Sequence, residues 1–141
     1  RAPDLEDLLR AFLEPAMALT AGDDERAEEI RQLISRLQSQ RSKMQDEVIG
    51  LFREVVERFT ALLTRALPDL DRETLMWRLH FMIGSMCHSF GDPKGIEQMS
   101  HGVCCMSDGS KLIDNMVAAY AGAFRAPAPA HIAVSPTSQS A

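Results

Sequence analysis

WRLHFMIGSMCHSF, residues 77–90, places apolar side chains on almost every side of a predicted helix. At 100° per residue, these side chains fall into two stripes that are rotated round the helix from each other. The first stripe contains Met76, Leu79, Ile83, Met86 and Phe90. The second stripe contains Trp77, Phe81, Gly84, Ser85 and His88. A helix with two such faces has to be buried on both.

Two different partners are expected to cover these faces. The first face can pack against the first helix and the long helix of the same chain. The second face can be covered only by the last helix and by a second copy of the protein. Gly84 and Ser85 would let a partner helix approach closely. The last helix offers a matching seam of Met116, Ala119, Tyr120, Ala123 and Phe124. We therefore predict a homodimer with a two-fold, four-helix interface; the alternative is a monomeric bundle in which both faces are covered from within.

The rest of the chain has helical periodicity without strand-like alternation, so we predict an all-α antiparallel bundle. Aspartates that can act as N-caps mark most of the expected starts. The expected helices begin at Asp4, at Asp23 or Asp24, at a capping box over 42–45, at Asp71, and at Asp108 or Ser110. Pro15 should kink or break the first helix near Phe12. Residues 94–109 should be irregular, with at most a short turn over 96–99.

Composition restricts the class of protein. The 141 residues fit one domain, predicted over 1–126, followed by a disordered Pro-, Ala- and Ser-rich tail over 127–141. A net charge of −5 does not indicate a nucleic-acid surface, and no apolar run is long enough to span a membrane. Three cysteines favour reduced thiols in the cytoplasm. The chain starts at Arg1 without a methionine, so we expect it to be part of something longer.

Histidine and cysteine side chains offer the main chemical alternative. His101, Cys104 and Cys105 lie within five residues, and Cys87 and His88 lie on the preceding helix. Sulfur and imidazole suit Zn²⁺ or Cu⁺, which would make the domain a metal or thiol sensor. However, no C-x-x-C pair is present, and the plainer interpretation is a loop with incidental thiols and a Cys87 that packs as a small hydrophobe. No catalytic motif is found, so we predict neither an enzyme nor a cofactor.

Three segments resemble a known family. They are WRLHFMIG over 77–84, ALPDLD over 66–71 and AAYAGAFRAP over 118–127. Across residues 4–127 the chain resembles the C-terminal regulatory domain of bacterial TetR-family transcriptional regulators. It is most similar to the PsrA-like subgroup of fatty-acid-responsive regulators, from which residues 101–106 depart.

The resemblance implies an effector-binding and dimerisation domain of a repressor, whose N-terminal helix-turn-helix domain is absent from this chain and would make all contacts with DNA. The effector would be a small apolar or amphipathic molecule, with fatty-acyl compounds as one class. It would bind between the first, long and penultimate helices and shift the spacing of two DNA-reading heads. The predicted pocket residues are Phe12, Met17, Leu33, Leu37, Phe52, Phe59, Met76, His80 and Ile83. A helical interaction module without any ligand is a further alternative.

Overall fold

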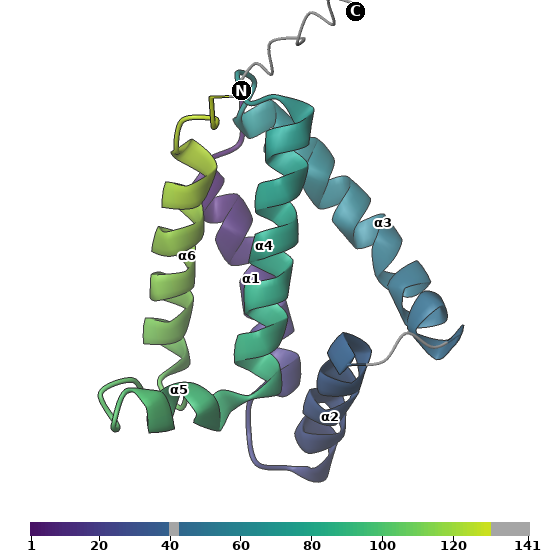
Figure 1. Cartoon of the computed structure of the whole chain (residues 1–141), viewed down its shortest axis with the longest axis vertical. Helices are drawn as coiled ribbons and strands as arrows, with labels where there is room; N and C mark the ends of the chain where they lie inside the picture. Colours follow the sequence, from purple (N-terminus) through teal and green to yellow (C-terminus); the bar gives the residue numbers. More distant parts are fainter. Residues whose placement is uncertain (40–42, 131–141) are drawn as a thin grey trace, which may run out of the picture.

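The computed structural model describes residues 1–39 and 43–130, which form six α-helices and contain no β-strand. The helices are α1 (Leu5–Thr20), α2 (Glu25–Ser39), α3 (Lys43–Ala66), α4 (Arg72–Gly91), α5 (Pro93–Met99) and α6 (Gly109–Arg125). Helices α1, α4 and α6 lie together, α5 crosses their lower ends, and α2 and α3 flank α4 on the other side (Figure 1). The all-α prediction is confirmed.

Four aspartates begin helices as predicted. Each carboxylate accepts a hydrogen bond from the backbone N–H three residues later, at 2.8–3.1 Å. These N-caps are Asp4, Asp24, Asp71 and Asp108. Because the first N–H groups of a helix have no partner within it, the caps satisfy donors that would otherwise be unpaired.

Two local predictions were wrong in part: the first helix has no break, and the segment after Asp92 begins with a helix. Helix α1 is not broken, because it runs through Pro15 as one segment, and the buried Leu9 and Leu13 hold the turns before the proline in the core. Residues 93–99 form a regular helix rather than an irregular segment, since Asp92 caps it and Pro93 occupies its first turn. The predicted capping box at Ser42 and the tail from residue 131 onward lie outside the described residues.

The core lies where α1 meets α3, α4 and α6. Its most deeply buried side chains are Leu9, Leu13, Leu63, Leu75, Leu79, Met82, Ile113 and Phe124. Phe12 stacks on Phe59 with ring centroids 4.3 Å apart, which joins α1 to the C-terminal half of α3. The N-terminal half of α3 diverges from this core, as Figure 1 shows.

Candidate effector site and dimer surface

The second stripe of α4 faces away from the core. Trp77 and Phe81 are 56% and 63% exposed, and their rings stack with centroids 5.9 Å apart. Gly84, Ser85 and His88 are also exposed, and a Cβ added to Gly84 would meet nothing within 4 Å. Within the described part of the chain, nothing covers this aromatic stripe.

Helix α6 extends this exposed stripe on one side. The Ser85 and Tyr120 hydroxyls are 2.8 Å apart and link α4 to α6, while burial raises the pKa of the Tyr120 phenol against the opposing effect of that hydrogen bond. Ala119 and Ala123 lie exposed on the same helix, one turn apart. We call the combined set the α4–α6 surface. It consists of Trp77, Phe81, Gly84, Ser85, His88, Ala119, Tyr120 and Ala123.

Two residues predicted for the dimer interface belong instead to the chain's own core. Met116 and Phe124 are only 7% and 2% exposed. On α6, their side chains point toward α1 and α4, so they have almost no area to offer a second subunit. The sequence pattern did not distinguish them from Ala119 and Ala123 because all four lie within one broad apolar sector of the helix.

The predicted pocket residues fall into three groups. The first is Phe12 and Phe59, which belong to the core, and the second is Met17 alone. Phe59 is 5% exposed and Phe12 is half-buried against it. Their rings stack between α1 and α3, and neither side chain lines the two cavities described below. Met17 lies apart from both, at the far end of α1, and packs next to Gly109, where a Cβ would come within 3.0 Å of its terminal methyl group.

The third group contains the six remaining predicted residues, which lie on α2, α3 and α4. Its exposed apolar members are Phe52 at 55%, Met76 at 42% and Leu33 at 36%. His80 is exposed, and Ile83 and Leu37 are half-buried. Five of these six side chains are apolar, and three of those five have a third or more of their surface in water.

One face of α3 is buried in the C-terminal half of the helix and exposed in the N-terminal half. Phe52 precedes Phe59 by seven residues, which places the two side chains within about 20° of each other round the helix. Val55, at 51% exposure, lies on the same side. The same face of α3 is therefore buried at Phe59 and Leu63 and exposed at Phe52 and Val55. The spacing of apolar residues is unchanged along the helix, and the difference arises because the N-terminal half of α3 diverges from the core.

On α4, Met76, His80 and Ile83 lie on the flank away from α6. They are rotated by about 40–100° from the core-facing Leu79 in one direction. Arg78, which donates to the Phe124 carbonyl of α6 at 2.7 Å, is rotated about 100° in the opposite direction. Met76 and His80, together with Glu73 and Trp77, line a cavity of about 290 Å³. All four lining residues belong to α4, so this is an open depression on one helix, and of the predicted pocket residues only Met76 and His80 line it.

A larger cavity of about 870 Å³ was not predicted. It lies between the middle of α2, the short helix α5 and the ends of α1, α4 and α6, and of the predicted pocket residues only Met17 lines it. Phe90 and Leu112 add further apolar lining, and charged side chains such as Asp23 and Lys94 also border the cavity. The sequence held little signal for this cavity, because its lining comes from five separate helices.

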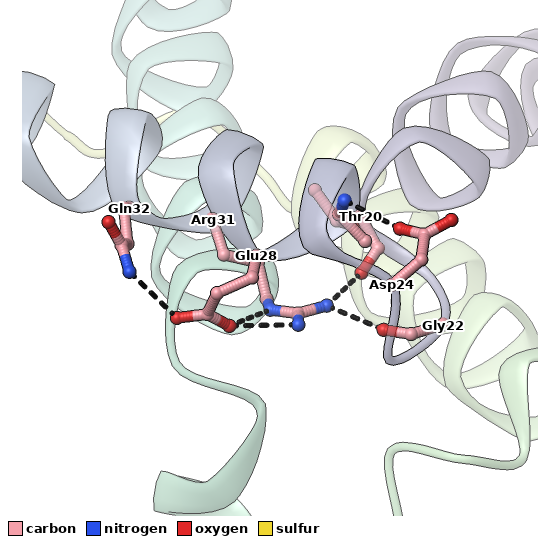
Figure 2. A network of polar contacts seen from close by, with 7 residues as sticks. Thr20, Gly22, Asp24, Glu28, Arg31 and Gln32 are labelled. Atoms are coloured by element: carbon pink, nitrogen blue, oxygen red, sulfur yellow. Dashed lines mark hydrogen bonds and ion pairs between the residues drawn. The ribbon is translucent and has the colours of Figure 1, made fainter.

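Arg31 fixes one wall of the larger cavity (Figure 2). Its Nη1 donates to the Thr20 and Gly22 carbonyls at 2.7 and 2.9 Å, and its Nε and Nη2 donate to the Glu28 carboxylate at 3.2 and 2.9 Å. These hydrogen bonds, followed by the one from Gln32, hold the pKa of Glu28 below its usual value. One guanidinium thus joins the end of α1 to α2.

We expect Arg31→Met to lower the free energy of unfolding by about 1–3 kcal/mol, since the Thr20 and Gly22 carbonyls lose a largely buried charged donor while most of the apolar stem is kept. The matched control is Arg58→Met. Arg58 pairs with Glu54, but both side chains are more than 70% exposed, so its loss should cost less than about 0.5 kcal/mol. Urea unfolding of both variants checks this, and equal effects would show that the Arg31 network does not stabilise the α1–α2 connection.

The cysteines do not assemble a metal site. Cys104 and Cys105 are exposed in the loop before α6, whereas Cys87 is half-buried on α4. Among the described residues, no group of three or more His, Cys, Asp or Glu side chains is placed to hold a metal ion. The predicted zinc or copper sensor therefore has no ligand set in this part of the chain.

Comparison with known proteins adds one match. Residues 10–123 match the family model described as tetracyclin repressor-like, C-terminal domain. No curated protein and no solved structure matches the chain. None of the helices in the described ranges is long and apolar enough to cross a membrane.

Proposed function

The chain belongs to the tetracyclin repressor-like C-terminal domain family, and from this membership we propose that it is the effector-sensing and dimerising part of a TetR-family repressor. The observation that carries this proposal is the exposure of α4 on two flanks. Its outer stripe, with Trp77 and Phe81, fits a second copy of the chain, and its lateral flank, with Met76 and His80, fits an effector. DNA binding would belong to a helix-turn-helix domain outside these residues.

Three properties of the α4–α6 surface support a homodimer. It combines the exposed rings of Trp77 and Phe81 with small residues such as Gly84, Ala119 and Ala123, so protruding rings have shallow positions to fill. It contains no Asp, Glu, Lys or Arg, which matches the depletion of charge at the centre of protein interfaces. Its two helices lie side by side, so a two-fold axis through them would generate four packed helices.

The third pocket group supports an apolar or amphipathic effector. Phe52, Met76 and Ile83 would contact an apolar body, and His80 would be the polar group that orients a head group. This chemistry suits a fatty-acyl ligand, the class implied by the similarity to the PsrA-like subgroup. Flexible methionine side chains also tolerate variation in the shape of the ligand.

We further propose how such a ligand would act. A molecule packed between the diverging half of α3 and the flank of α4 would favour the conformation in which α3 lies closer to α4. Because Phe59 of α3 stacks on Phe12 of α1, a shift of α3 would move α1 as well. The movement of α1 would then reset the spacing of the two DNA-binding domains of a dimer.

Phe52→Trp is expected to weaken ligand binding without unfolding the domain, because the larger ring occupies the proposed site while position 52 is not part of the core. The probe is 1-anilinonaphthalene-8-sulfonate, titrated by fluorescence and displaced with dodecanoate. Met99→Trp, at a residue of α5 that is 75% exposed, is the matched control and should leave both affinities unchanged. Unchanged dodecanoate affinity in Phe52→Trp would contradict the placement of the effector beside α3.

A further inference from the structure

The cysteine pair in the loop between α5 and α6 has a chemistry that effector sensing does not use. Cys104 and Cys105 are adjacent in sequence and both are exposed. Cys87 is half-buried, and burial raises the pKa of its thiol. Because the thiolate is the reactive form and has to be accessible, a soft electrophile in solution meets the exposed pair before it meets Cys87.

The loop holds this pair between two anchored points of the backbone. The Cys104 N–H donates to the Ser100 hydroxyl at 2.9 Å, and the Met106 N–H donates to a Glu97 carboxylate oxygen at 3.1 Å. Neither cysteine lies in a helix, and their Cα atoms are joined by a single peptide unit of about 3.8 Å. Both exposed side chains can therefore rotate toward one shared ligand.

We propose that Cys104 and Cys105 together form a dithiol site for a monosubstituted trivalent arsenical. Each S–H bond is replaced by an S–As bond, and the oxygen of the arsenical leaves as water with the two thiol protons. Arsenic stays trivalent and no electrons are transferred, so the step needs no oxidant. Two sulfur atoms complete the coordination of such an arsenical, whereas structural zinc needs four ligands.

The site is separate from the proposed effector site and from the α4–α6 surface, because its loop contributes to neither. It therefore neither depends on the proposed function nor alters it. The nearby Met106 and Ser107 line the larger cavity, and the Cys105 sulfur lies 2.8 Å from the Ser107 hydroxyl. Arsenic on the pair would replace that contact at the edge of the cavity.

The test uses phenylarsine oxide with the full, reduced chain and intact-mass spectrometry. We expect one phenylarsenic group per chain that survives excess glutathione, a monothiol, and is removed by the dithiol 2,3-dimercaptopropanol. Cys104→Ser and Cys105→Ser should each lose the glutathione-resistant adduct, while Cys87→Ala retains it. Exposed cysteine-to-serine changes have little effect on stability, and circular dichroism of each variant checks the fold.

A second measurement does not rely on any variant. Trypsin cleavage after Lys94 and Lys111 leaves both loop cysteines on one peptide, while Cys87 lies on the peptide before it. Arsenic found on the 95–111 peptide supports the proposal. No resistant adduct on the unaltered chain, a resistant adduct that persists in either serine variant, or arsenic on the Cys87 peptide would overturn it.

Discussion

Phe81→Asp is expected to dissociate the homodimer into monomers that remain folded. Phe81 is 63% exposed in the single chain, so its replacement removes no core contact. In the proposed dimer the same change buries an unpaired carboxylate, and the two-fold axis introduces it twice. If each site contributes about 2 kcal/mol, as a central aromatic residue does, the dimer weakens by about 4 kcal/mol, or roughly 1,000-fold in Kd.

Sedimentation equilibrium over a range of concentrations measures this shift, and circular dichroism reports helix content. Val103→Asp is the matched control, because Val103 is also apolar and is 87% exposed, but lies in the α5–α6 loop. It should leave the dimer unchanged. If Phe81→Asp and Val103→Asp had the same association constant, the α4–α6 surface would not be the interface.

The second large effect is a difference in stability between two alanine variants on one face of α3, one in the core and one in the proposed effector site. Phe59→Ala should lower the free energy of unfolding by about 3–5 kcal/mol, since it leaves a cavity beside Phe12. Phe52→Ala, two turns earlier on the same face, should cost less than about 1 kcal/mol because Phe52 is 55% exposed. Urea unfolding at equal protein concentration measures both, since a dimer's stability depends on concentration.

Comparable destabilisation by Phe59→Ala and Phe52→Ala would mean that the N-terminal half of α3 packs against the core in solution. The proposed effector site would then be closed. A small effect at Phe52 combined with loss of dodecanoate binding in Phe52→Trp would instead support a ligand-binding role for this exposed half.

The helix pattern was predictable because its signals are local. An N-cap aspartate such as Asp71 accepts a hydrogen bond from the backbone N–H three residues later. Helix α3 ends at Ala66, two residues before Pro68. The continuity of α1 through Pro15 was not predictable from local rules, because the loss of one hydrogen bond is outweighed by burial of Leu9 and Leu13 in tertiary contacts.

The candidate site was only partly predictable, because periodicity identifies an apolar face but not what covers it. Phe52 and Phe59 are equivalent by spacing, yet only Phe59 is buried, since α3 diverges from the core between them. Likewise Phe124 and Ala123 are neighbours on one apolar sector of α6 and face different surroundings. The larger cavity depends entirely on how five elements meet.

Native mass spectrometry of the unaltered chain tests the central claim most directly, because it reports the number of subunits and any bound molecule together. We predict a species at twice the 15.6 kDa of one chain, with any additional mass matching a co-purified effector. A stable monomer at micromolar concentration would contradict the proposal, since Trp77 and Phe81 would then remain exposed to water without a second subunit to cover them.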